Sequence, residues 1–263
     1  MRRQFKLWVS CLASLTSFLL VPCVVAQPKL ASVAPLSDEA FSVLQKHYLL
    51  GRWQIFVNKD KVKAVNLSEG YSIVTMAPTW KVMFYRDGST PKMYETTMRE
   101  FLVAGIPLSS YYVIEGRLDQ AKKSRAQFKG LNTVLFTLMR ADRTKVKPAW
   151  TLGDLPPESP VVLSKYWLAP AISNNDTVCK FVQKLFMMPA TNGYPVAFVD
   201  VRADHTHTAV LDITSCKGFP PAAVQIVYPT PAKYKVCKGQ RDVTLSAGKR
   251  EGLNDWAEVL GKD

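Results

Sequence analysis

Apolar and polar residues alternate with a period of two along the N-terminal half of the chain, which is the pattern of half-buried β-strands. The alternating runs lie at 53–57, 62–67, 71–75 and 80–85. Short groups rich in Asn, Asp and Gly, which favour tight turns, separate them at 58–60, 69–70 and 87–88. These spacings predict an antiparallel meander of short strands with large apolar side chains on one face.

The second half repeats this strand pattern with longer connections. It predicts strands at 111–118, 132–139, 195–201, 209–214 and 223–228, and short edge strands at 234–236 and 242–245. A basic segment at 119–130 separates the first two strands, and the Pro-rich segment 145–160 predicts a long loop that could serve as a hinge.

Apolar residues at helical spacing predict four helices. Ser37 can cap a helix that ends at Gly51, a short helix follows at 96–103, and two more lie at 173–187 and 249–260. The predicted fold class is therefore α+β: a curved antiparallel sheet or unclosed β-barrel with helices packed on or in its concave face.

The first 26 residues have the order of features found in a secretory signal peptide. Arg2, Arg3 and Lys6 precede an uncharged stretch at 7–26, which ends in Val24-Val25-Ala26. A membrane anchor is the alternative, because the stretch approaches spanning length. Lipidation at Cys23 is disfavoured by the preceding proline. We expect cleavage before Gln27 and a single exported domain at 27–263, in the periplasm or outside the cell.

The chain is strongly basic, with a formal net charge of +13 at pH 7. The predicted signal holds three of the 34 basic residues and none of the 21 acidic ones, so 27–263 keeps a net charge of +10. Such a surplus suits an anionic membrane or envelope surface, although it equally keeps a protein in solution. Nucleic acid is not an expected partner for an exported protein.

Three cysteines, Cys179, Cys216 and Cys237, lie outside the predicted signal. In an oxidising compartment an odd number suggests one bridge and one remaining thiol. Cys216 and Cys237 are the nearer pair in sequence, which makes them the disulfide candidates.

The sequence contains no G-x-S-x-G, no H-E-x-x-H and no phosphate-binding glycine loop. His205 and His207 have the spacing of two metal ligands on one strand, but they fall at a predicted hairpin tip and have no evident third ligand. No catalytic residue, metal or cofactor is therefore predicted, and a secreted hydrolase is the least favoured function.

Large apolar residues on the predicted strands and on the short helix are candidates to line a ligand cavity. They are Trp53, Ile55, Ile73, Trp80, Val82, Phe84, Tyr94, Phe101 and Phe198. Their commoner role is core packing. A curved sheet that its helices do not fill would instead leave an apolar space for an acyl chain.

The early strands follow one another with a regular rhythm at 51–57, 63–66, 71–74 and 77–82, and a closing proline-aromatic pattern lies at 194–196, 211–215 and 231–236. In both features the chain resembles periplasmic carriers of outer-membrane lipoproteins. The resemblance implies an unclosed β-barrel with a helical lid that carries acylated lipoproteins or lipid. The segments 119–130 and 145–160 depart from the family's compact pattern.

Two functions are therefore expected ahead of hydrolysis. The first is an exported, non-enzymatic binding protein that holds a lipid, an acyl chain or an acylated protein in a half-barrel cavity. The alternative is a structural or interaction protein of the cell envelope that binds anionic partners through a basic surface.

Overall fold

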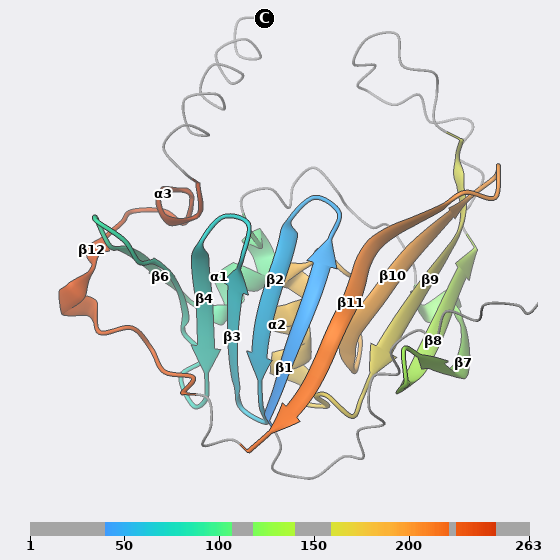
Figure 1. The fold of residues 1–263 in the computed structure, drawn as a ribbon, viewed down its shortest axis with the longest axis horizontal. Helices are drawn as coiled ribbons and strands as arrows, with labels where there is room; N and C mark the ends of the chain where they lie inside the picture. The colour runs from blue at the N-terminus through green and yellow to red at the C-terminus, as the bar shows by residue number, and fades with distance from the viewer. Residues whose placement is uncertain (1–39, 107–117, 140–158, 221–224, 246–263) are drawn as a thin grey trace, which may run out of the picture.

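The computed structural model describes residues 40–106, 118–139, 159–220 and 225–245. In these ranges, twelve strands form one unclosed sheet in the order β12-β6-β5-β4-β3-β2-β1-β11-β10-β9-β8-β7 (Figure 1). Neighbouring strands are antiparallel except β12, which pairs in parallel with β6. The sheet dominates the fold, and the described helices are few and short.

The N-terminal half supplies one side of the sheet and the C-terminal half supplies the other, apart from β12. The strands are β1 (Ala40–His47), β2 (Gly51–Val57), β3 (Lys61–Asn66), β4 (Tyr71–Met76), β5 (Val82–Arg86), β6 (Lys92–Thr96), β7 (Lys122–Phe128), β8 (Leu131–Met139), β9 (Val161–Ala169), β10 (Tyr194–Arg202), β11 (His207–Phe219) and β12 (Lys235–Val236). The helices are α1 (Met98–Ala104), α2 (Asp176–Leu185) and α3 (Arg241–Thr244), with 3₁₀ turns η2 (Leu118–Gln120) and η4 (Pro231–Lys233).

The strand pattern predicts β2 to β5, β8, β10, β11 and β12, and the structure confirms each of them. The predicted helices at 96–103 and 173–187 are confirmed as α1 and α2. Strands β6 and β9 were not expected. The predicted elements at 111–117 and 249–260, the signal peptide, and nearly all of the 145–160 loop lie outside the described residues.

The helix predicted from Ser37 to Gly51 is wrong over the residues that the structure describes. Residues 40–47 form β1, which lies between β2 and β11 in the middle of the sheet. Phe41, Val43, Gln45 and His47 are all buried, while the residues between them are partly or fully exposed. Because the buried residues Gln45 and His47 are polar, the sequence of β1 does not show the alternation of apolar and polar residues that is typical of a strand.

Three smaller assignments also need correction. The basic segment 119–130 contains β7, an edge strand whose lysines suit the rim of a sheet, because charge there discourages pairing with other chains. Residues 242–245, predicted as a strand, largely form α3. Of the strand predicted at 223–228, residues 225–228 are irregular and the others lie outside the described residues.

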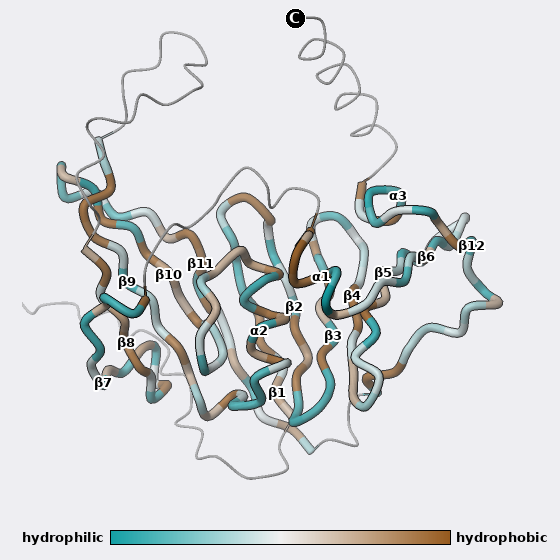
Figure 2. Tube along the Cα trace, turned by 180° about the vertical axis from the view of Figure 1, so that it is seen from behind, coloured by the Kyte–Doolittle hydropathy of each residue, from teal (hydrophilic) through white to brown (hydrophobic). Residues whose placement is uncertain are grey.

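Helices α1 and α2 lie on the same side of the sheet, as the view from behind shows (Figure 2). Both begin at firm N-caps: Thr97 forms a capping box with Glu100, and Asn175 accepts hydrogen bonds from the amides of Thr177 and Val178. The ring of Phe101 on α1 stacks on Phe181 of α2 with centroids 4.9 Å apart. The two helices thus pack together through the apolar side chains that they turn inward.

The segment 225–237 packs on the opposite face of the sheet, over β4, β5 and β6. Ile226, Tyr228 and Tyr234 belong to a second apolar cluster there, together with Val74, Met83, Tyr85 and Met93. The chain then adds β12 to the β6 edge and reaches α3, whose Val243 belongs to the main core. The C-terminal segment therefore covers one end of the sheet.

Candidate interaction surface

The predicted cavity-lining residues form a packed core. Seven of the nine are at most 1% exposed, namely Trp53, Ile55, Ile73, Val82, Phe84, Phe101 and Phe198. Trp53 makes edge contacts with Tyr71 and Phe186, at centroid distances of 5.6 and 6.0 Å. Trp80 and Tyr94 are half-buried at the margin of the same cluster. Rings from the sheet therefore interlock with rings from the helices.

An open recess of about 400 Å³ lies at the edge of this core, between β6, α1 and the segment before α3. Tyr94 and Phe101 line it, together with Glu100, Ala104 and the residues at 239–241. Of the predicted ligand-binding residues, these two are the ones that reach this recess. A smaller pocket of about 140 Å³ lies beside the turns that follow β1 and β3.

Several of the polar groups buried in the core link its strands by hydrogen bonds. The hydroxyl of Tyr194 donates to Gln45 Oε1 over 2.8 Å, and Gln45 Nε2 donates to the carbonyl of Pro195 over 2.7 Å. These bonds join β1 to β10, which are not neighbours in the sheet. Ser164 on β9 donates to the carboxylate of Asp200 on β10. Such satisfied pairs have a structural role.

His47 shapes the turn between β1 and β2. Its Nδ1 accepts hydrogen bonds of 3.2 Å from the amides of both Leu49 and Leu50, so the ring is held neutral with its proton on Nε2. The ring also stacks on Phe186 with centroids 5.9 Å apart. Burial lowers the pKa of His47 to about 4, because the charged form would lose its hydration.

The other candidate chemistry does not assemble in the described residues. His205 and His207 are exposed at the β10–β11 hairpin, as predicted, and no group of three His, Cys, Asp or Glu there could hold a metal. Cys179, Cys216 and Cys237 all carry free thiols. The predicted pair is therefore not bridged, and six strands separate β11 from β12 in the sheet.

The face of the sheet turned away from the two helices is cationic where β11, β1, β2 and β3 cross it. Cross-strand neighbours Val43, Ile55 and Ala64 are fully buried on the helix side. Because successive side chains point to opposite faces, the residues between them form the other surface. We call its basic residues the cationic face: Lys46, Arg52, Lys61, Lys63 and Lys217.

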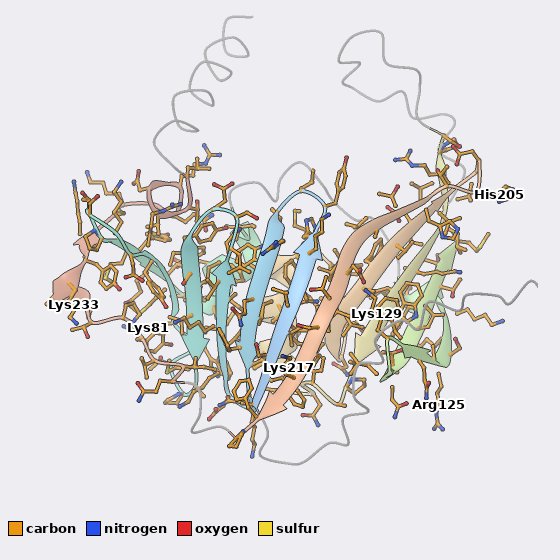
Figure 3. All side chains as sticks on the ribbon, viewed as in Figure 1. Lys81, Arg125, Lys129, His205, Lys217 and Lys233 are labelled. Carbon is orange, nitrogen blue, oxygen red and sulfur yellow. The ribbon has the colours of Figure 1, made fainter. Side chains whose placement is uncertain are left out.

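Asp212 is the only carboxylate on that face among the described residues of these four strands. It already forms an ion pair with Lys129. Lys129, reaching over from the β7–β8 turn, places its Nζ 2.6 and 2.7 Å from the two oxygens of Asp212. Figure 3 labels this lysine and Lys217 on β11. Partly exposed Leu44, Phe56 and Val65 lie between the cations. The surface therefore combines a positive field with scattered apolar contacts.

Several solved structures match this one distantly. No protein-family model matches the sequence, and no curated protein matches it. The structure of PNGF-II aligns with a TM-score of 0.32 and 9% identity, over 69% of this chain and 28% of that one. An uncharacterized conserved protein from Thermus thermophilus aligns with a TM-score of 0.29 and 7% identity, over 77% of this chain and 93% of that one. This chain thus spans little more than a quarter of the first protein.

No described helix is long and apolar enough to cross a membrane.

Proposed function

We propose that this protein is a non-enzymatic binding protein that holds an anionic surface against its cationic face. The observation that carries the proposal is the charge of that face. Its four neighbouring strands, β11, β1, β2 and β3, present five cations and one carboxylate, and Lys129 already neutralises that carboxylate. Cations held on a rigid sheet sum their fields and attract an extended anionic partner.

The proposal includes export, with residues 1–26 acting as the signal peptide, which brings the cationic face to an envelope surface. It also includes the finer fold expected from the carrier-like resemblance, in which the sheet curves around α1 and α2. The ring contacts of Phe186 with Trp53 and of Phe101 with Phe84, at 6.0 and 6.1 Å, support this arrangement.

The test compares two triple variants with the same change of charge. Lys46→Gln, Lys61→Gln and Lys217→Gln remove three cations from the cationic face, whereas Lys233→Gln, Lys235→Gln and Lys238→Gln remove three exposed cations from the C-terminal segment. Binding to immobilised polyglutamate is measured over a series of salt concentrations.

We expect the first variant to lose at least tenfold in affinity and to show a weaker salt dependence, because fewer counterions are exchanged on binding. The C-terminal variant should bind nearly as well as the unmodified protein. Equal losses in both variants would mean that only net charge matters, and the cationic face would then have no special role.

A second candidate function is binding of an apolar ligand in the recess between β6, α1 and the segment before α3. It is favoured by Tyr94 and Phe101, which supply an aromatic wall to that recess. Ala104→Trp would fill the space, so it should abolish a lipid adduct seen by native mass spectrometry. Protein that carries no adduct before the substitution would refute this candidate.

A further inference from the structure

Large apolar side chains are exposed together at two neighbouring turns of the sheet. Tyr48 and Leu49 follow β1 and are 66% and 45% exposed, and Leu67 follows β3 and is 42% exposed. The other large apolar residues exposed in the described part of the chain occur on separate elements, namely Val103, Met139, Val162, Val227 and Val236. Apolar side chains that are exposed to solvent next to one another often mark a site of contact with a protein or a membrane.

Hydrogen bonds link the turn that follows β1 to the turn that follows β3. The amide of Leu67 donates to the carbonyl of Arg52 over 2.8 Å, and Asn66 Nδ2 donates to the carbonyl of Leu50 over 3.2 Å. Gly51 has a φ of +74°, and a Cβ there would lie 2.4 Å from Ser68 Oγ. The backbone therefore presents the three apolar side chains from a fixed double turn, which lies at the top of the sheet in Figure 1.

Cations flank the double turn on one side. Lys46 and Arg52 are exposed cross-strand partners on β1 and β2, one step before the terminal pair of His47 and Gly51. The acid on these turns, Glu69, is half-buried, and Arg86 adds a further cation beside it, because the Arg86 guanidinium donates to the Glu69 backbone carbonyl over 2.6 Å. The double turn thus has an apolar tip with positive charge just behind it.

We infer that the anionic surface is a lipid bilayer, and that the double turn inserts Tyr48, Leu49 and Leu67 at the boundary between its headgroups and acyl chains. Lys46 and Arg52 would then lie at the level of the lipid phosphates, where basic residues are attracted to anionic lipid. Tyr48 suits this depth, because its ring is apolar and its hydroxyl can stay hydrated. This inference rests on the proposed function and names its partner.

The experiment uses phosphatidylcholine vesicles with and without phosphatidylglycerol, and immobilised polyglutamate as a lipid-free anion. The tip variant carries Tyr48→Ser, Leu49→Ser and Leu67→Ser. Its matched control carries Val103→Ser, Val227→Ser and Val236→Ser, which remove exposed apolar groups elsewhere. Circular dichroism and a thermal melt verify that each variant is folded.

We expect the tip variant to lose at least tenfold in affinity for the anionic vesicles while it keeps its binding to polyglutamate, and the control to keep both. A Tyr48→Trp reporter should be quenched by lipids brominated in the acyl chain. If the tip variant binds anionic vesicles as tightly as the control, or the reporter is not quenched, insertion is refuted while the proposed function stands. Failure of the unmodified protein to bind either probe would refute both.

Discussion

The two faces of strands β1, β2 and β3 share one backbone and carry opposite chemistry. On the helix side, Val43, Ile55 and Ala64 are completely buried under a layer that includes α2. On the other side of the same strands, Lys46 and Arg52 are exposed to solvent and Lys63 is partly exposed. Because alternate residues serve the core and the surface, stability and binding can be altered separately by substitutions one position apart.

The largest difference is expected between two aromatic residues of β2. Trp53→Ala should lower the free energy of unfolding by about 3–5 kcal/mol, because the ring is fully buried and its Nε1 donates to the carbonyl of Leu50. Phe56→Ala, on the partly exposed face, should lower it by only about 1 kcal/mol. Urea denaturation measures both, and similar losses would mean that the two faces are equally part of the core.

On the helix side, His47 contributes to the way the fold responds to acid. The folded-state pKa of His47 is lowered from 6.5 to about 4, so the unfolded chain takes up a proton first as the pH falls. The contribution to stability is complete above pH 6.5 and is lost as the pH drops towards 4, by about 3 kcal/mol in all.

His47→Asn isolates this contribution, because the Asn side chain can accept from the same turn amides but takes up no proton in this range. The difference in stability between pH 7 and pH 4, measured by urea denaturation, should be smaller in the variant by about 3 kcal/mol. An unaltered pH dependence in the His47 variant would contradict the assignment.

The sequence predicted the parts of the fold in which apolar periodicity and turn residues agree. Strands β2 to β5 have clear alternation between turns, and α2 has an Asn cap followed by apolar residues at helical spacing. The pattern of β1 resembles that of a helix because two of its buried positions are Gln45 and His47. Gln45 is buried with hydrogen bonds to and from β10, and His47 accepts from the amides of the next turn. The partners of Gln45 lie about 150 residues away in the chain, so they leave no local pattern.

The candidate surface was predictable only in part for a similar reason. The surplus of basic residues is visible in the composition, and Lys46 and Arg52 meet in one local hairpin. Lys217 joins the same face only because β11 pairs with β1, which is far away in the chain. The period of two predicts that the apolar rows face inward, and Trp53, Ile55 and Phe84 are fully buried. Whether helices fill the space beside them depends on three-dimensional packing that periodicity does not encode.

A smaller effect is expected from the helix that covers one end of the core. In α1, Thr97 Oγ1 accepts from the amide of Glu100 over 3.2 Å, and the Glu100 carboxylate accepts from the amide of Thr97 over 3.0 Å. Thr97→Ala should lower stability by about 1 kcal/mol. Thr177→Ala in α2, where Asn175 is the cap, should cost less. Equal costs would show that the capping box contributes little to holding α1 on the sheet.

The smallest effect on stability is expected on the cationic face. Lys46 has two cross-strand partners: Arg52, which repels it, and Asp212, whose charge Lys129 already neutralises. The repulsion from Arg52 therefore dominates, and Lys46→Gln should raise the free energy of unfolding by about 0.3 kcal/mol. The same change should weaken binding to anionic vesicles by about fivefold, because each basic residue near such a surface adds about 1 kcal/mol of attraction. If Lys46→Gln stabilises the fold while it weakens binding, Lys46 and Arg52 serve recognition of the anionic partner and not stability. If Lys46→Gln instead destabilises the protein by more than about 1 kcal/mol, the cations are needed for folding, and the contrast between the two faces fails.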